Sequence, residues 1–188
     1  GVRFETRAHV GYNVPVEDLR NEFDALLIAG GAEKPRDLKV PGRELKGIHF
    51  AMDFLSQQNK RVAGDEDLRA DPTRWPEPIV ATGKRVAIIG GGDTGADCLG
   101  TCIRQGALEV FQLEIMPKPP EERSDRTPWP MWPYQLRMES SHEEGGIRMW
   151  SVATVGFSGD EYGNVRKLHA VKVGPPPEFA PIPGTEFT

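Results

Sequence analysis

"VAIIGGGDTGADC", residues 86–98, runs four apolar residues directly into three glycines, an acid, a hydroxyl and a fourth glycine. An apolar run that ends in glycines is typical of a buried parallel strand followed by a tight turn. We therefore expect a strand over 84–89, a helix over 93–105 that Gly106 ends, and a second strand over 108–115. This order predicts a strand–turn–helix–strand unit with parallel strands.

The glycines of this turn fit the pattern G-x-G-x-x-G at Gly90, Gly92 and Gly95. In that pattern the first glycine permits the sharp turn, the second lets the backbone approach a pyrophosphate, and the third lets the helix pack closely on the strand. Gly91 completes the loop, and the helix start adds free N–H groups and a partial positive charge. The context predicts a dinucleotide site, while tight-turn packing alone is the structural alternative.

Asp93 and Thr94 follow the loop directly. Thr94 is expected to donate its hydroxyl to a phosphate. A carboxylate does not suit a phosphate, so Asp93 is expected to face away from it, either capping the helix or meeting a second ligand. Both interpretations of Asp93 stay open.

Glu114 stands at the end of the second predicted strand. An acid in that place accepts hydrogen bonds from an adenosine ribose and repels a 2′-phosphate, which favours NADH over NADPH. Arg123 and Arg126 lie in the loop that follows and could instead hold a 2′-phosphate. The coenzyme is therefore NADH or NADPH, with NADH favoured.

The fold class that these patterns predict is α/β, a Rossmann-like parallel sheet with helices on both faces and an added β-hairpin. The other elements that we expect are strands over 2–10 and 24–32, helices over 15–23, 48–60 and 134–146, a linker over 63–82, an irregular proline-rich loop over 117–133, and a hairpin over 147–173 with its turn at 159–163.

Composition excludes several classes of function. The 188 residues carry a net charge of −5 and lack a basic cluster, which argues against nucleic-acid binding. No apolar run approaches the length of a membrane span, so we expect no membrane partner. Cys98 and Cys102 are too few for a disulfide scaffold, and we expect both to pack in the core. Such sparse cysteine use also predicts a reducing, cytoplasmic compartment. The histidines have no ligand spacing, so we expect no metal site.

Three segments together resemble the small (beta) subunit family of glutamate synthase. They are DALLIAGGAEKPRDLKVPGRELKGIHFAMDFLSQQNKRV (24–62), VAIIGGGDTGADCLGTCIRQGA (86–107) and FQLEIMPKPPEERSDRTPWPMWP (111–133). The third, with its prolines and tryptophans, is more specific than the glycine turn. The resemblance extends over essentially the whole chain.

The resemblance implies a flavoprotein with two dinucleotide-binding domains, one for FAD and one for NAD(P)H. NAD(P)H would pass a hydride to FAD, and the electrons would go through iron–sulfur clusters to the large subunit, which makes glutamate from glutamine and 2-oxoglutarate. Gly30 and Gly31 would belong to the junction loop near both cofactors. The implied division is a partial FAD-domain segment and junction over 1–45, the NAD(P)H-binding domain over 46–178, and a return linker over 179–188.

The chain also departs from the family pattern. It has no cysteine-rich segment for iron–sulfur clusters and no second glycine loop for FAD, so we expect a piece of a longer protein that is inactive alone. Hydride transfer between coenzymes needs orientation more than an acid or a base, so no catalytic residue is assigned. Two alternatives remain: a module of another NAD(P)H–flavin oxidoreductase, and a non-catalytic nucleotide-binding or subunit-docking domain.

Overall fold

A computed structural model describes residues 1–32, 34–64 and 77–188. The chain divides into two units, Gly1–Pro35 and Arg36–Thr188, and each is described by itself. The predicted linker over 63–82 lies mostly outside the described residues. The predicted domain divisions after residues 45 and 178 stay predictions.

The first unit contains helix α1 (Val16–Glu22), which confirms the helix predicted over 15–23. The chain enters it at Pro15, and acids in its first turn favour its positive end. The strands predicted over 2–10 and 24–32 are wrong, since neither segment forms a strand. Leu27 and Ile28 are 93% and 94% exposed, and a strand is stabilised by a ladder and a buried face that the described residues do not supply here.

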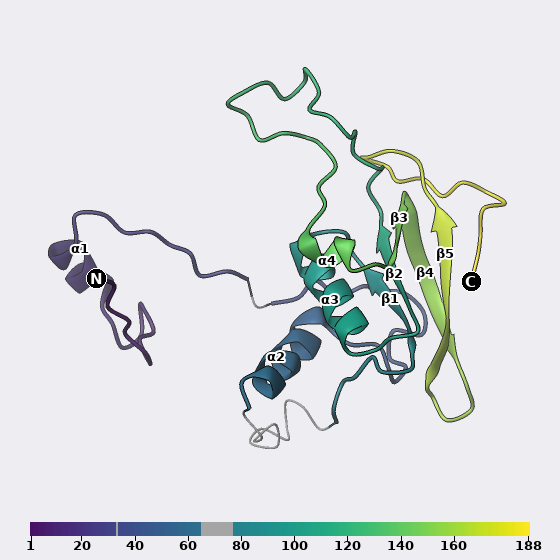
Figure 1. Ribbon diagram of the computed structural model, residues 1–188, viewed down its shortest axis with the longest axis horizontal. Helices are drawn as coiled ribbons and strands as arrows, with labels where there is room; N and C mark the ends of the chain where they lie inside the picture. The colour runs from purple at the N-terminus through teal and green to yellow at the C-terminus, as the bar shows by residue number, and fades with distance from the viewer. Residues whose placement is uncertain (33, 65–76) are drawn as a thin grey trace. The chain divides into compact units, whose positions relative to one another are not determined.

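The second unit is built on a three-stranded parallel sheet in the order β1-β2-β3 (Figure 1). Its strands are β1 (Arg85–Ile89), β2 (Glu109–Glu114) and β3 (Ile147–Trp150). The register pairs Ile89 with Leu113 and Glu114 with Trp150. The carboxyl ends of all three strands therefore meet at one edge of the sheet, where open α/β sheets bind their ligands.

Three helices pack on one face of this sheet: α2 (Ala51–Val62), α3 (Asp93–Arg104) and α4 (Ser140–Glu143). Helix α3 connects β1 to β2 and ends at the positive-φ Gly106, as the sequence predicts. Leu99 of α3 is completely buried at the centre of this layer. The surrounding core consists of Phe54, Ala81, Cys98, Cys102 and Val110.

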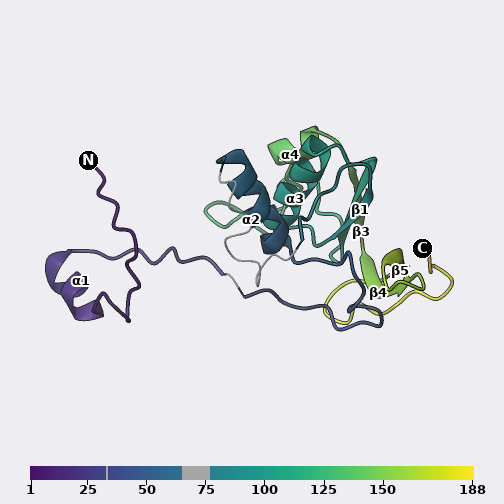
Figure 2. The same cartoon turned by 90° about the horizontal axis from the view of Figure 1, so that it is seen from below.

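An antiparallel hairpin, β4 (Val152–Gly159) and β5 (Val165–Lys172), packs against the opposite face of the sheet at β2 and β3 (Figure 2). Ala87 and Ile89 of β1 stay exposed on that face. A second core joins Leu113 of β2 to Val152 and Ala170 of the hairpin. The α/β class, the parallel sheet and the hairpin are thus confirmed. In the described part of the chain the hairpin takes the place of the second helical layer that we expected.

The segment 147–173 is divided differently from its prediction. Its first strand, β3, pairs parallel with β2, and only β4 and β5 form the hairpin. Ser151 separates β3 from β4 with a φ of 55°, a left-handed conformation that turns the chain between the two sheets. Alternating apolar residues cannot reveal which sheet a strand joins, because both pairings have the same period.

The helix predicted over 134–146 is mostly wrong, because only Ser140–Glu143 is helical. The residues before it are held in other contacts: the Leu136 N–H donates to the Pro120 carbonyl at 2.6 Å, and the Arg137 guanidinium lies 3.8 Å from the Trp132 ring centroid. The segment 117–133 has neither helix nor strand, as predicted.

Cys98 and Cys102 are both free and buried in the helical core. Burial raises the pKa of Cys98 to about 12 and that of Cys102 to about 11, so both remain neutral thiols near pH 7. These properties support the packing interpretation. Within the described ranges no helix is long and apolar enough to cross a membrane.

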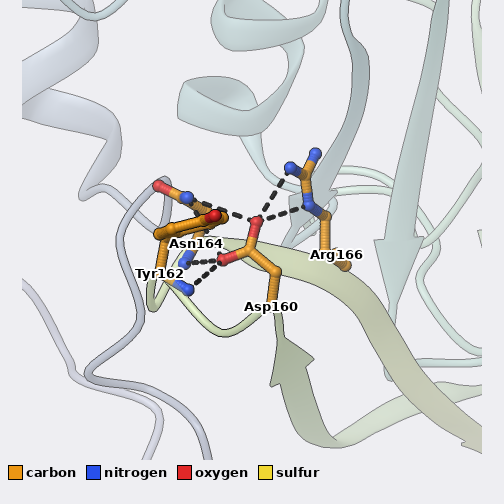
Figure 3. A network of polar contacts seen from close by, with 4 residues as sticks. All are labelled: Asp160, Tyr162, Asn164 and Arg166. Atoms are coloured by element: carbon orange, nitrogen blue, oxygen red, sulfur yellow. Dashed lines mark hydrogen bonds and ion pairs between the residues drawn. The ribbon is translucent and has the colours of Figure 1, made fainter.

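The hairpin turn is organised by the carboxylate of Asp160 (Figure 3). Its Oδ1 accepts the N–H groups of Tyr162 and Asn164 at 3.0 and 2.9 Å, and its Oδ2 accepts Nε of Arg166 at 2.8 Å. The hydrogen bonds from Asn164 are the main cause that lowers the pKa of Asp160, although the group is solvent-accessible.

We expect Asp160 to titrate below its ordinary pKa of 3.8 in the folded chain. A lowered folded pKa means that the carboxylate stabilises the turn above pH 3.8 and that this contribution is lost as pH falls through the folded value. Side-chain carboxyl NMR would measure the midpoint. Asn164→Ala removes the side-chain hydrogen bonds to Asp160 but keeps the backbone N–H, so it is expected to raise the midpoint by only part of the shift. A midpoint at or above 3.8 in the unaltered chain would contradict the hydrogen-bond network.

Candidate functional site

A cavity of about 270 Å³ lies at the carboxyl ends of the three parallel strands. One wall is the glycine turn, with Gly91, Gly92 and Asp93. The facing wall is the extended segment before α4 together with side chains from the ends of β2 and β3. Whole small-molecule sites measure roughly 300–1,000 Å³, so this cavity is slightly smaller than a complete site of that kind.

Two loop glycines and the packing glycine are required by the fold itself. Gly90 has a φ of 122°, which L side chains rarely adopt. A Cβ on Gly91 would lie 2.9 Å from the Glu114 Cβ, and a Cβ on Gly95 would lie 2.6 Å from the Gln112 Nε2 and still closer to the Gly90 carbonyl oxygen. The predicted roles of Gly90 in the turn and of Gly95 in helix–strand packing match this geometry.

Gly92 is different, because the fold places no demand on it. It is the N-cap of α3 with φ −80° and ψ −177°, an ordinary extended conformation. A Cβ there would meet nothing within 4 Å. The missing side chain leaves open space at the mouth of the helix.

The start of α3 also offers unused hydrogen-bond donors. The first helical bond runs from the Ala96 N–H to the Gly92 carbonyl at 3.0 Å, so the N–H groups of Asp93, Thr94 and Gly95 precede the helical ladder. Such groups, together with the helix dipole, favour an anion. Open space beside free N–H groups is the geometry that a pyrophosphate requires.

Glu114 is anchored to the loop backbone. One carboxylate oxygen accepts the Gly91 N–H at 2.7 Å, and the other accepts the Met116 N–H at 2.8 Å. Glu114 also lines the cavity, as its predicted ribose contact requires. Glu114 fixes the glycine turn to the end of β2. The lone pairs left on its carboxylate oxygens could accept hydrogen bonds from ribose hydroxyls.

Asp93 does not cap α3, since it is the first helical residue and the helix has no side-chain cap. Asp93 is exposed and lines the cavity, and its contact with a second ligand stays a prediction. Thr94 is exposed in the same helical turn.

Two arginines lie on the facing side of the cavity, Arg137 and Arg148. Arg148 is half-buried, stacks 4.6 Å from the Trp150 ring centroid and donates to the Arg137 carbonyl at 3.1 Å. Burial lowers the pKa of Arg148, while nearby Glu114 opposes that change. The sequence contained no motif that marked either arginine as part of the site.

A buried polar chain connects the two walls. His142 Nδ1 accepts the Glu139 N–H at 3.1 Å, and His142 Nε2 lies 3.0 Å from Gln112 Oε1. Gln112 Nε2 then donates to the carbonyl of Gly90 at 3.0 Å. His142 is 9% exposed and Gln112 is 1% exposed. One feature of the sequence marks this chain of hydrogen bonds: Gln112 stands between apolar residues in the middle of β2.

Of the predicted site residues in the second unit, Gly91, Gly92, Asp93 and Glu114 line this cavity, whereas Gly90, Thr94, Gly95 and Arg123 do not. Arg123 donates to the Met131 carbonyl at 2.9 Å within the proline-rich loop and does not line the cavity. Gly30 and Gly31 belong to the first unit, whose placement relative to the second is not defined. Over residues 1–32, 34–64 and 77–188 no cluster of His, Cys, Asp or Glu could hold a metal ion.

Comparison with protein families and solved structures identifies close relatives. A family model described as pyridine nucleotide-disulphide oxidoreductase matches residues 3–168. Among solved structures, the complex of Mycobacterium tuberculosis FprA with NADPH is similar at a TM-score of 0.51 and 15% identity, covering 95% of this chain and 50% of that one. That likeness supports the fold.

The sequence relatives are more similar. The glutamate synthase [NADPH] small chain of Mycobacterium tuberculosis (strain ATCC 25618 / H37Rv) is 48% identical over 188 residues, which are 100% of this chain and 38% of that protein. The glutamate synthase [NADH] of Schizosaccharomyces pombe is 41% identical over 181 residues, which are 92% of this chain and 8% of that protein. The chain thus spans well under half the length of these relatives.

Proposed function

This chain belongs to the pyridine nucleotide-disulphide oxidoreductase family, and from that premise we propose that it binds NADH or NADPH across the turn Gly90–Gly95. The pyrophosphate would lie over Gly92 and take hydrogen bonds from the free N–H groups of Asp93, Thr94 and Gly95. The adenosine ribose would meet Glu114. The observation that carries this proposal is the open space at Gly92, since the fold does not itself require glycine there.

The chemistry at such a site is supplied by the coenzyme, which carries a hydride when it is bound in its reduced form. The residues of this chain bind and orient it. The glycine turn fixes the pyrophosphate, and Glu114 holds the turn through the Gly91 N–H. No side chain is needed to move a proton.

In the longer protein we propose that the hydride goes to FAD and that the electrons serve glutamate synthesis from glutamine and 2-oxoglutarate. The large subunit of glutamate synthase would be the partner. The identity of 48% to a glutamate synthase small chain supports this role. The junction loop at Gly30 and Gly31 would lie near both cofactors. We also propose a cytoplasmic location, which the two free, buried thiols support.

Titration of the 188-residue chain with NADH and with NADPH at pH 8 tests the binding proposal. We expect micromolar to millimolar dissociation constants, because the cavity is slightly smaller than a complete small-molecule site. Coenzyme fluorescence would report binding, and equal titrations with AMP would show whether the pyrophosphate contributes. If neither dinucleotide binds up to 10 mM (about −2.7 kcal/mol of binding free energy), the proposal fails and a docking role is favoured.

A further inference from the structure

We propose that neutral His142 is a positioning residue that ties together the two walls of the dinucleotide cavity, and that its protonation releases the wall before α4 and weakens binding. This inference rests on the proposed function for its ligand. Its geometric basis is the buried chain through Glu139, His142, Gln112 and Gly90.

The hydrogen bonds determine the tautomer of His142. The Glu139 N–H is a donor, so Nδ1 must carry a lone pair. The proton of the neutral ring is therefore on Nε2 and is donated to Gln112 Oε1. The Gln112 amide is in turn oriented, because its Nε2 donates to the Gly90 carbonyl. Each group in this chain has a fixed direction.

This series of hydrogen bonds links elements that are far apart in the sequence. Gln112 lies in β2, His142 lies in α4, and Gly90 directly follows β1. Glu139 is the N-cap of α4 and lines the cavity, and its side chain also closes a capping box with the His142 backbone. Fixing the Glu139 N–H therefore fixes the wall that faces the glycine turn.

Protonation would break one link of the chain. A proton on Nδ1 would point at the Glu139 N–H, which has no lone pair to offer. The bond from Nε2 to Gln112 would remain. The extended segment over 134–139 would lose an anchor, while the glycine turn would keep its bond from Gln112.

The groups around His142 favour its neutral form. Burial lowers the pKa of His142 most, Arg148 from β3 lowers it further, and Glu139 opposes them. From α3, Arg104 is paired with Glu144, and Asp93 lines the same cavity, as does Glu114 of β2. The pKa of His142 in the folded chain lies below 6.5. The stabilisation that neutral His142 provides is therefore complete above pH 6.5 and is lost as pH falls below that value.

The first experiment observes the hydrogen bond between His142 and Glu139 in the absence of any ligand. NMR of the isotope-labelled 188-residue protein would titrate the His142 ring, identified by its absence in His142→Gln. We expect the Glu139 amide resonance to move with the same midpoint as the ring. A Glu139 amide that does not respond would overturn the proposal, whether or not a dinucleotide binds.

The second experiment measures affinity for ADP-ribose, which keeps the adenosine and pyrophosphate and is stable in mild acid. From pH 8 to pH 5.5 we expect the dissociation constant to rise severalfold but by less than about tenfold, because one linked proton gives at most tenfold per pH unit below the pKa and the pKa of His142 lies under 6.5. His142→Gln does not titrate and lacks the ring Nδ1 that accepts the Glu139 N–H. It should bind more weakly than the unaltered chain already at pH 8, by at least the factor that acid produces in the unaltered chain, and lose most of the pH dependence, on the same linkage.

His49→Gln is the matched control, because His49 also titrates but does not line the cavity. This variant should keep the pH dependence. Affinity that stays constant with pH in the unaltered chain overturns the role of His142 while leaving the proposed function intact. If ADP-ribose does not bind at any pH but the Glu139 amide titrates with His142, the proposed function fails. The hydrogen-bonded link between His142 and Glu139 is then retained.

Discussion

Gly92→Val is expected to abolish dinucleotide binding while leaving the fold unchanged. The backbone at residue 92 has φ −80° and ψ −177°, which valine adopts readily, and a Cβ there contacts nothing within 4 Å. The new methyl groups would fill the space over the free N–H groups of α3. We expect the dissociation constant for NADH to rise at least 100-fold, or about 2.7 kcal/mol.

Urea unfolding followed by circular dichroism should give a midpoint equal to that of the unaltered chain. Gly174→Ala serves as the control, because residue 174 also accepts a Cβ in ordinary contact, 3.7 Å from the Ala180 carbonyl oxygen, but does not line the cavity. That variant should bind NADH normally. A folded Gly92→Val protein that binds NADH with unaltered affinity would place the pyrophosphate elsewhere.

Gly95→Ala is expected to have the opposite effect, a loss of stability rather than a selective loss of binding. The added Cβ would lie 2.6 Å from the Gln112 Nε2 and closer still to the Gly90 carbonyl oxygen, which is backbone and cannot move aside alone. Overpacking of this kind costs about 1–3 kcal/mol in the free energy of unfolding. The same methyl group would also disrupt the bond from Gln112 to Gly90.

Urea denaturation measures the loss, and Asp97→Ala is the control within the same helix. Asp97 is exposed on α3, and alanine is a better helix former there, so that variant should be at least as stable as the unaltered chain. A Gly95→Ala protein with unaltered stability would mean that α3 can move away from β1 without cost. The assignment of a binding role to Gly92 and a packing role to Gly95 would then fail.

The comparison of Gly92 with Gly95 shows why a glycine motif alone is weak evidence. The pattern records only where side chains are missing. The structure distinguishes a glycine that the fold requires, such as Gly95, from Gly92, where the fold would accept a side chain. The second kind is the informative one for a ligand site.

Glu114 and Arg123 illustrate the limits in the other direction. The sequence placed Glu114 at the end of β2, and the structure adds that its carboxylate holds the Gly91 N–H. The contact of Arg123 with a 2′-phosphate stays a prediction; in the structure Arg123 donates to the Met131 carbonyl in its own loop. An arginine in a long irregular loop has no periodicity that fixes its direction.

The sequence by itself determined the local unit around residues 86–98. The apolar strand, the glycine turn and the helix depend on residues near one another in the chain, so composition and spacing define them. The same local rules identified α1 and the irregular loop over 117–133.

Only the tertiary structure decided which strand pairs with which and which side chains line the cavity. The exposed segment at Leu27 and Ile28 looks like a strand but has no partner in the described chain, whereas β3 joins the parallel sheet and not the hairpin. The link from His142 through Gln112 to Gly90 spans three elements. Strand pairing and buried hydrogen bonds depend on residues that meet only after the chain has folded, and no short-range pattern encodes them.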